Sequence, residues 1–370
     1  MAELRIEAVQ RYLNKLYGKD VRLISVGGLP PTGKKDELKG CGYGEPVLIE
    51  YEVDGTRARA VFETVKAGGF GHDFLSDRAG VLILAHETFN RLPEHVASLD
   101  AGALTKRGEL VSVGDAEEFF VLDKYVEGTE YFRDLERIKE DGKLAPHDTK
   151  RAIALSDYLV RIHATKKDIP GLYIRRIRDL VGHGEGIMGL IDSYPADWQF
   201  LPQGTLQRIE EACLAWRWKL RGKEHRLSQI HGDYHPWNIL FKDEEGSGFW
   251  VLDRSRGEFG EPADDVTAMS INYIFYSLQK YGELKGPFEE LYLAFIKNYL
   301  EKTDDKGLLE VVQPFYIWRG LVIASPLWYP NLEASVRNKV FNFIENVLKL
   351  EKFDFNEINS YLLSAANQRT

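Results

Sequence analysis

The stretch that decides the fold is HGDYHPWN, residues 231–238, which is followed by Asp253 at the end of an apolar run, Phe249 to Leu252. Asp233 and Asn238 stand five residues apart around a turn, so a carboxylate and an amide oxygen can reach the same small volume. Asp253 adds a second carboxylate after a short predicted strand. Oxygen ligands of this kind suit Mg²⁺, which proteins usually hold with one or two carboxylates together with phosphate and water oxygens.

This spacing is typical of sites that transfer phosphoryl groups. In the kinase arrangement, an Asp accepts the proton of the substrate hydroxyl, while an Asn five residues on and an Asp after a strand hold magnesium. The sequence therefore predicts Asp233 as the catalytic base and Asn238 and Asp253 as Mg²⁺ ligands. ATP or GTP is the expected co-substrate.

The two histidines of the stretch have different expected roles. His231 is predicted to brace the loop through hydrogen bonds, because an Asp already serves as the proton acceptor. His235 is a candidate acceptor-site residue, and packing beside Trp237 is its alternative role.

The chain resembles the aminoglycoside phosphotransferase and choline kinase group, the small-molecule relatives of protein kinases. Four segments carry the resemblance: LVRIH at 159–163, HGDYHPWNIL at 231–240, DRS at 253–255 in place of Asp-Phe-Gly, and GEPADD at 260–265. The resemblance is close from about residue 125 to residue 270. It implies an α+β, bilobal, protein-kinase-like fold, with an N-terminal antiparallel β-sheet lobe and a mainly helical C-terminal lobe.

The resemblance also implies roles for particular residues. Asp265 is similar to a structural acid whose helix supports the catalytic loop. The segment Val121 to Val126, with Asp123 and Tyr125, resembles a hinge whose main-chain groups bind a purine. These expectations divide the chain into a nucleotide-binding lobe at 1–122, a hinge at 123–128, and a helical lobe at 129–370 that holds the catalytic loop and the acceptor site.

Periodicity along the chain agrees with this division. A helix at 4–17, a helix at 74–91 and about five strands are expected before residue 123, with Asp54-Gly55 as a hairpin turn. The predicted strands are 21–26, 46–53, 58–65, 109–113 and 118–122. After residue 123, helices are predicted at 151–165, 205–220, 263–280, 287–302 and 336–350. Short strands are predicted at 227–230, 239–241 and 249–252.

The first lobe departs from the kinase pattern. Glu63 stands where a phosphate-binding Lys belongs, so Lys66 is the nearest candidate for that role, with Asp77 or Glu87 as its partner on the next helix. The segment 28–35 misses a Walker A match at one position, and a Walker site is rejected. Residues 27–44 are instead expected to form a long glycine-bearing loop over the phosphates.

Two segments, 68–73 and 182–186, are dense in glycine, which indicates that their backbone lies close to another part of the protein or to a ligand. The second lies in the region 173–194, which is expected to border the acceptor site. Arg175, Arg176 and Glu185 are its candidate residues, and the two arginines are expected to face either an acidic substrate or an acidic helix. One further cluster is expected either in the core or as a wall of an acceptor pocket: Phe315, Tyr316, Trp318, Trp328 and Tyr329.

Composition narrows the class of protein. The 48 Lys and Arg residues against 57 Asp and Glu residues give a formal net charge of −9. With no long basic block, nucleic acid is not an expected partner. Two distant cysteines, Cys41 and Cys213, predict reduced thiols rather than disulfides or a zinc site. No stretch approaches the ~20 apolar residues that span a bilayer, so a cytoplasmic location without membrane association is expected.

The sequence thus predicts an ATP-dependent small-molecule kinase that phosphorylates a hydroxyl group. A nucleotide-binding pseudokinase without transfer activity is the alternative, favoured by the unusual first lobe and disfavoured by the intact Asp233, Asn238 and Asp253. A protein kinase fits less well, because Asp-Phe-Gly, Ala-Pro-Glu and a long activation segment are missing. Neither the acceptor nor the oligomeric state can be derived from the sequence.

Overall fold

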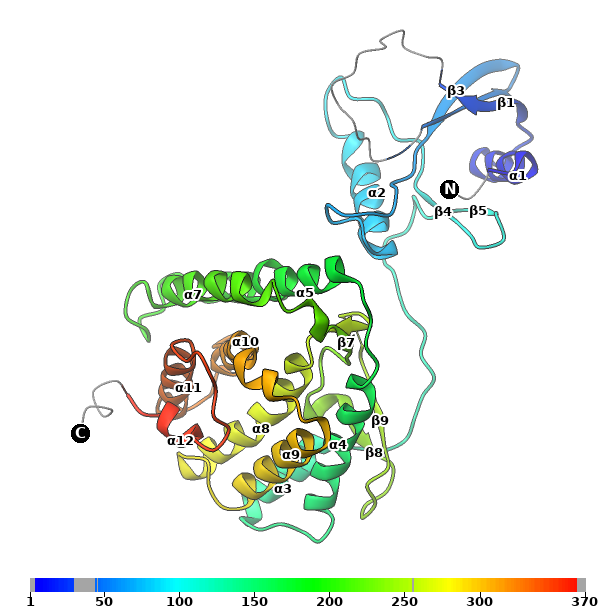
Figure 1. Ribbon diagram of the computed structural model, residues 1–370. Coiled ribbons are helices and arrows are strands. Elements are labelled where there is room, and N and C mark those ends of the chain that lie inside the picture. The colour runs from blue at the N-terminus through cyan, green and yellow to red at the C-terminus, as the bar shows by residue number, and fades with distance from the viewer. Residues whose placement is uncertain (1–3, 30–43, 45, 255, 365–370) are drawn as a thin grey trace. The chain divides into compact units, whose positions relative to one another are not determined.

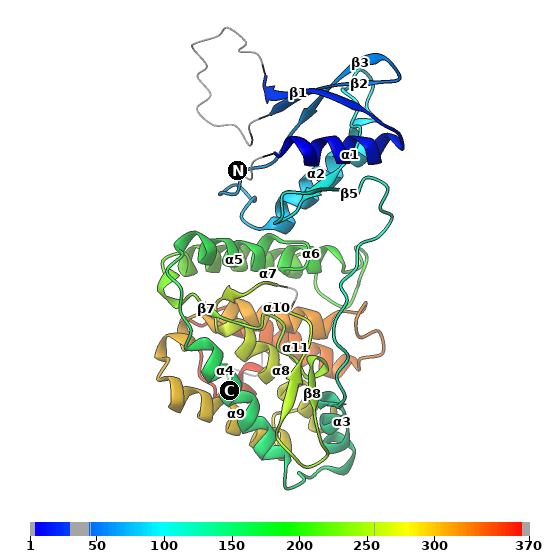
Figure 2. The same cartoon turned by 90° about the vertical axis from the view of Figure 1, so that its right-hand side faces the viewer.

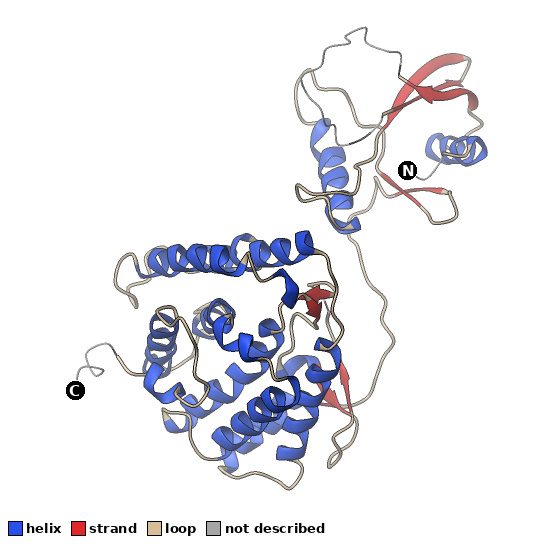
Figure 3. Cartoon of the chain, viewed as in Figure 1, coloured by secondary structure: helices blue, strands red, loops and turns tan. Residues whose placement is uncertain are grey.

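The computed structural model describes residues 4–29, 44, 46–254 and 256–364, and the chain divides into two compact units, 1–123 and 124–370. Antiparallel strands form much of the first unit, whereas the second is mainly helical (Figure 3). The predicted α+β class is confirmed. Among the described residues, no helix is both long enough and apolar enough to cross a membrane.

A three-stranded antiparallel sheet forms the centre of the first unit. It is built from β1 (Arg22–Gly28), β2 (Val47–Val53) and β3 (Thr56–Phe62) in the order β1-β2-β3. Asp54 and Gly55 connect β2 to β3 with φ values of 51° and 75°, the left-handed conformation that a tight two-residue hairpin requires. The expected hairpin is therefore confirmed.

Helix α1 (Ile6–Tyr17) packs on this sheet (Figure 1). Its apolar stripe buries Val9 and Leu13 against Ile49 and Tyr51 of β2. Burying such a side chain contributes about 1.5–3 kcal/mol, which makes this small cluster the main source of stability in the unit. The remaining elements are α2 (Leu75–Phe89), β4 (Gly102–Leu104) and β5 (Leu110–Ser112).

The expected sheet of about five strands is wrong in two respects. The pair β4-β5 forms a separate two-stranded sheet, and β4 lies outside every predicted strand. The segment predicted as a strand at 118–122 has no strand structure, and its Phe120 and Leu122 are 89% and 90% exposed. Apolar β-prone residues form a strand only where a neighbouring edge offers hydrogen bonds, and this segment pairs with none of the described strands.

The second unit is built around α8 (Ala263–Tyr281), whose first sixteen residues are all buried. Four helices contact it: α3 (Tyr131–Asp141), α9 (Pro287–Thr303), α10 (Val312–Ala324) and α11 (Ala334–Val347). The other helices are α4 (Asp148–His163), α5 (Pro170–Gly182), α6 (Ile187–Asp192), α7 (Thr205–Leu220) and α12 (Ile358–Tyr361). Helices α5 and α7 lie side by side (Figure 2).

Short strands and single helical turns frame the candidate site in this unit. Strands β6 (Thr129–Glu130), β8 (Ile239–Phe241) and β9 (Phe249–Val251) form one antiparallel sheet, and β7 (Ser228–Gln229) pairs with β10 (Phe259–Gly260). The 3₁₀ turns are η1 (Glu224–Arg226), η2 (Pro236–Asn238) and η3 (Lys306–Glu310). All five helices predicted for this part of the chain are present, whereas α3, α5, α6, α10 and α12 were not predicted.

The two cysteines differ in what can be said of them. Cys213 on α7 is a free, buried thiol, and burial raises its pKa to about 12. It is therefore protonated and inert, as expected. Cys41 lies outside the described residues, as does most of the glycine-bearing loop predicted at 27–44.

Candidate active site

One buried carboxylate holds the loop at 231–238. Asp265, in the first turn of α8, accepts the backbone N–H of His231 and that of Gly232, each at 2.7 Å. Nε2 of His163, at the end of α4, lies 3.1 Å from the same carboxylate. Burial favours the neutral acid, but the bond to His163 and its charge outweigh burial and lower the pKa of Asp265. An ionised Asp265 therefore ties two helices to the loop.

The side chain of His231 points back into its own loop. Burial lowers the pKa of His231, so the ring is neutral near pH 7. Its Nδ1 accepts the backbone N–H of Asp233 at 3.2 Å. This contact is of the bracing kind that the sequence suggested for His231, and it fixes the backbone at Asp233.

Asp233 is surrounded by cationic and hydrogen-bonding groups. Nη1 of Arg319, from α10, donates to its Oδ1 at 2.7 Å, and Nη1 of Arg256 lies 3.4 Å from the same oxygen. Nε2 of His235 lies 3.4 Å from Oδ2. Burial alone raises the pKa of a carboxylate, but His235 and the two arginines together hold the pKa of Asp233 well below its ordinary range. Asp233 is therefore a carboxylate throughout the physiological pH range.

His235 packs beside Trp237, one of the two roles considered for it, and also lies near Asp233. Its ring contacts that of Trp237, with centroids 5.9 Å apart, and its Nδ1 accepts a hydrogen bond from the backbone N–H of Trp237. Its other nitrogen faces Asp233 and the amide of Asn238. Packing and proximity to the predicted base are thus combined in one side chain.

Asn238 and Asp253 are brought to the same end of the β8-β9 ladder. The Asn238 carbonyl accepts the backbone N–H of Leu252 at 2.9 Å, which places Asp253 one residue beyond the contact. The Asn238 amide donates to the Asp233 carbonyl at 3.0 Å, so its Oδ1 faces away from that bond. Asp253 has a φ of 53°, a conformation that non-glycine residues adopt at a cost and that often marks functional sites.

These residues fit a hard divalent cation. Among the described residues, neither Oδ1 of Asn238 nor the exposed carboxylate of Asp253 has a hydrogen bond or ion pair, so both oxygens are available as ligands. An amide oxygen and a carboxylate match the ligand preference of Mg²⁺. Ser255, which completes the segment at 253–255, lies outside the described residues.

Two arginines of the site, Arg319 and Arg256, were not predicted from the sequence. Arg319 is the only charged residue of α10 and is almost fully buried, between Asp233 and the carboxylate of Asp264, each at 2.7 Å. A lone charge in an apolar helix must find a partner, so its position was a usable signal. Arg256 follows Asp253 by three residues, and no pattern in the sequence distinguished it. The ring of Trp318 lies against both guanidinium groups, at 4.0 Å from Arg319 and 4.3 Å from Arg256.

The candidate nucleotide-binding residues occupy irregular parts of the chain. Lys66 is exposed and lies four residues beyond the end of β3, because the strand predicted to reach residue 65 ends at Phe62. Asp123 and Tyr125 lie on the extended segment between β5 and β6, where Tyr125 is 83% exposed. Asp77, one of the two suggested partners for the Lys, accepts the backbone N–H of Phe74 at the start of α2.

The glycine-dense segment at 182–186 approaches its own helix closely. A Cβ at Gly186 would lie 2.4 Å from the carbonyl oxygen of Asp179, so a larger residue cannot fit without displacing backbone. Arg175, one turn earlier, donates to the Asp179 carboxylate at 2.8 Å, and Arg176 donates to the Phe259 carbonyl at 2.9 Å. Glu185 instead faces the segment that follows Asp253, at 3.8 Å from Nε of Arg256.

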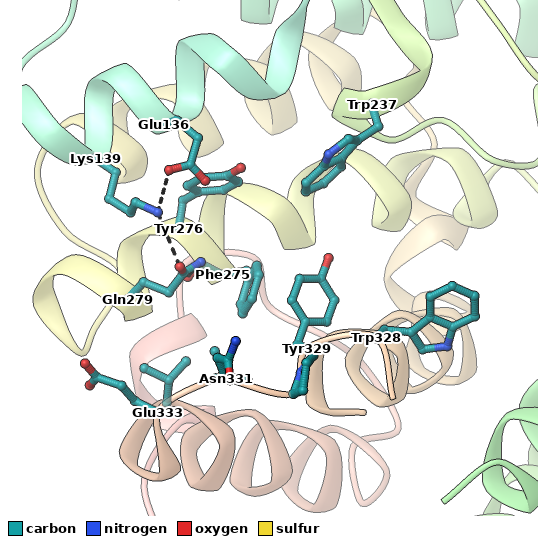
Figure 4. Close-up of a pocket in the computed structure, with 13 residues that line it drawn as sticks. Glu136, Lys139, Trp237, Phe275, Tyr276, Gln279, Trp328, Tyr329, Asn331 and Glu333 are labelled. Atoms are coloured by element: carbon teal, nitrogen blue, oxygen red, sulfur yellow. Dashed lines mark hydrogen bonds and ion pairs between the residues drawn. The ribbon is translucent and has the colours of Figure 1, made fainter. Parts of the chain in front are cut away.

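A pocket of about 530 Å³ lies between α3, the end of α8 and the segment that follows α10 (Figure 4). Trp237 of the catalytic loop lines it, together with the acids Glu136 and Glu333. The C-terminal aromatic cluster is divided between core and pocket: Phe315, Tyr316 and Trp318 are buried in α10, whereas Trp328 and Tyr329 line the pocket. The core role is therefore present for three members of the cluster, and the other two line a pocket.

Asp264 provides a pH-dependent prediction. Burial raises its pKa to about 6, against the attraction of Arg319. The unfolded chain, with a pKa of about 3.9, releases this proton first as pH rises, so stability falls between about pH 4 and pH 6 by on the order of 2–3 kcal/mol. Asp264→Asn does not titrate, and we expect its stability relative to the wild type to rise by that order across this window. Urea unfolding at several pH values measures the difference, and parallel curves would contradict the assignment.

The chain is similar to known proteins in its sequence and structure. The family model of the phosphotransferase enzyme family matches residues 95–285. No curated protein matches the sequence. Three similar solved structures are an ethanolamine kinase from Plasmodium vivax (15% identity, 93% of this chain and 82% of that chain, TM-score 0.33), a choline/ethanolamine kinase family protein from Mesorhizobium loti (11%, 71% and 78%, 0.38) and an amicoumacin kinase in complex with AMP-PNP, Ca²⁺ and Ami (15%, 90% and 94%, 0.38).

The chain belongs to the phosphotransferase enzyme family, since the matched segment spans more than half of its length. This segment contains Asp233, Asn238 and Asp253. The resemblance drawn from the catalytic loop is confirmed. The family defines a phosphotransferase, and the particular reaction depends on what the site binds.

Proposed function

We propose that the protein transfers the γ-phosphate of ATP or GTP to a hydroxyl group of a small molecule, with Mg²⁺ bound by Asn238 and Asp253 and with Asp233 as the base. The observation that carries the proposal is the convergence of these three residues. Asn238 bonds the Asp233 main chain through its amide and the strand end before Asp253 through its carbonyl. A single short ladder thus joins a base to two oxygen ligands.

The base acts mainly by position. With a pKa held well below its ordinary range, Asp233 does not remove a proton from a free alcohol. It orients the hydroxyl by accepting its hydrogen bond and takes the proton as the bond to phosphorus forms, when the proton becomes acidic. When bound, Mg²⁺ neutralises charge on the phosphates and aligns the transferred group. Arg319 and His231 keep the carboxylate and its backbone fixed during this step.

The flanking assignments remain part of the proposal. Main-chain groups near Asp123 and Tyr125 are proposed to bind the base of the nucleotide, and Lys66 to contact its phosphates. His235, Arg175, Arg176 and Glu185 are proposed to border the acceptor. A nucleotide-binding pseudokinase is the alternative, but three intact groups with chemical roles give no reason to prefer it.

Replacement of the carboxylate that is proposed to bind metal tests this function. We expect Asp253→Asn to raise the Mg²⁺ concentration needed for half-maximal activity by about 100-fold, because even an outer-shell partner of a metal ligand is worth about 10–100-fold. Mg²⁺ titrations of ADP formation, over a panel of alcohols, amino alcohols and sugars, measure this shift.

Asp304→Asn is the matched control, since Asp304 is also an exposed Asp in the left-handed conformation, with a φ of 49°. We expect its Mg²⁺ requirement to equal that of the wild type. Equal Mg²⁺ requirements in wild type and Asp253→Asn would remove Asp253 from the metal site. ADP formation by neither protein, with Mg-ATP still binding in a thermal-shift assay, would favour the pseudokinase.

A further inference from the structure

We propose that the acceptor carries an oxyanion, a carboxylate or a phosphate, and that the guanidinium of Arg256 binds this group beside Asp233. The inference rests on the proposed function, because it takes Asp233 as the group that the acceptor hydroxyl approaches. It goes further by naming the chemical class of the acceptor and the residue that selects it.

Arg256 is a largely buried cation, and among the described residues, which exclude the adjacent Ser255, it has no close partner. Its Nη1 lies 3.4 Å from Oδ1 of Asp233 and 3.4 Å from the Gly232 carbonyl, and its Nε lies 3.8 Å from Glu185. Charge-assisted hydrogen bonds are normally about 2.7–2.9 Å long, so all three contacts are loose. Nε itself is buried and has no hydrogen-bond partner among the described residues.

The neighbouring Arg319 makes short contacts that Arg256 lacks, although its own Nε is also buried without a hydrogen-bond partner among the described residues. Its two Nη atoms bond Asp233 and Asp264, each at 2.7 Å. Arg319 already forms a short hydrogen bond with Oδ1 of Asp233. Arg256 therefore makes only a longer contact with the same oxygen. The site therefore contains one more guanidinium than its buried carboxylates bind tightly.

Trp318 holds Arg256 in this position. The indole lies 4.3 Å from the Arg256 guanidinium and is itself buried in α10. Stacking on an aromatic ring occupies one face of a guanidinium and leaves its in-plane donors available for hydrogen bonds, and this planar fork matches a carboxylate or a phosphate with two such bonds. Burial, followed by the charge of Arg319, lowers the pKa of Arg256, and a bound anion relieves that cost.

The geometry points to the acceptor rather than to the nucleotide as the source of the anion. Arg256 approaches Oδ1 of Asp233, and the acceptor hydroxyl must reach the same carboxylate to deliver its proton. The proposed metal ligands, which face the nucleotide phosphates, are reached through the main chain of Asp233 instead. Glu185 occupies the rim near Arg256 with 68% of its side chain exposed, so an incoming anion can replace its weak contact.

The overall acidity of the chain gives the opposite impression. A net charge of −9 suits a cationic acceptor, and the pocket that contains Glu136 and Glu333 is acidic. Lys139 also lines that pocket and pairs with Glu136 at 2.6 Å, so the acidity of the pocket is partly neutralised. The charge that an acceptor meets at Asp233 is set locally by Arg256.

The binding part of the proposal is tested by NMR on arginine-labelled protein. The Nε–H resonance of Arg256 is assigned by its loss in Arg256→Lys, and inorganic phosphate and acetate are then titrated separately. We expect a saturable shift of this resonance with at least one of the two anions, at a Kd of roughly 1–10 mM. The two titrations distinguish a phosphate site from a carboxylate site. No shift, or the same shift for the exposed Arg221, would overturn the proposal.

The selectivity is tested by kinetics with matched probes: glycerol, glycerate, glycerol 3-phosphate and choline. We expect an anionic member to be the better acceptor, and Arg256→Gln to raise its KM by about 10- to 100-fold, the loss of one charged hydrogen-bond partner, while the KM for ATP stays unchanged. Arg221→Gln is the control and behaves as the wild type, because Arg221 is also an arginine stacked on a Trp ring, that of Trp218, but lies outside the region expected to border the acceptor. Preference for glycerol or choline, or a raised KM for ATP, would refute the inference.

Failure of the proposed function gives a different pattern. In that case Asp233→Asn transfers phosphate as well as the wild type does, whatever the Arg256 resonance shows. If none of the four probes is phosphorylated, the resonance titration decides the inference alone.

Discussion

Asp233→Asn is expected to lower the rate of phosphoryl transfer by about 10²- to 10⁴-fold, the usual contribution of a positioned general base. The amide has nearly the size of the carboxylate, so the loop and its bonds to Arg319 and Asn238 are retained in part, whereas the proton acceptor is lost. Binding of Mg-nucleotide should be unchanged, because the proposed metal ligands are intact. Single-turnover ADP formation measures the rate, and a thermal shift with Mg-ATP measures binding.

Asp157→Asn serves as the control for this substitution. Asp157 lies on α4, where it bonds Asn298 and Lys302 at the surface, and its replacement should leave the rate unchanged. A rate for Asp233→Asn within a few-fold of the control would show that Asp233 is not the base.

Asp265→Ala is expected to lower the free energy of unfolding and to abolish activity. The substitution leaves the buried N–H groups of His231 and Gly232 without an acceptor, at a cost of about 1–3 kcal/mol each. The pKa of Asp265 is lowered in the folded protein, so its stabilising contribution is present above the unfolded pKa and is lost as pH falls through the folded value. The loss of unfolding free energy in the variant should therefore be full at pH 7 and smaller at acidic pH. Urea unfolding at pH 7 and at an acidic pH measures this difference.

Asp148→Ala separates stability from activity. Asp148 is as buried as Asp265. It accepts a hydrogen bond from the Ala145 N–H and forms an ion pair with Arg137, but it has no contact with the catalytic loop among these bonds. We expect it to lower stability without changing the transfer rate of the folded protein. If Asp265→Ala, once folded, transferred phosphate at the wild-type rate, the proposed role of Asp265 in positioning the loop would be wrong.

The part of the site that could be predicted is the part set by local chain geometry. Asp233 and Asn238 share one turn, and the strand pair β8-β9 brings Asp253 to that turn, so residue type and spacing were sufficient. Arg319 and Asp264 meet only because α10 packs on α8, and the sequence contains no periodicity that reports this crossing. The contact of Arg319 with the base was missed for that reason, whereas Arg256 follows Asp253 closely but no pattern in the sequence distinguished it.

The fold of the first unit shows the same limit. The hairpin at Asp54-Gly55 follows from two residues that favour a left-handed turn, and it was predicted correctly. Residues 118–122 have strand-like composition, yet they form no strand, because pairing depends on a neighbouring edge. Local preferences were therefore reliable for turns and long helices, and unreliable wherever the outcome depended on a distant partner.

The most direct test of phosphoryl transfer is a ³¹P NMR spectrum of the protein incubated with Mg-ATP and the acceptor panel. We predict that the γ-phosphate signal declines while a phosphomonoester signal grows in step with ADP, and that Asp233→Asn shows neither change. An intact nucleotide that is nevertheless bound, or release of the phosphate only as orthophosphate, would contradict transfer to a small-molecule hydroxyl.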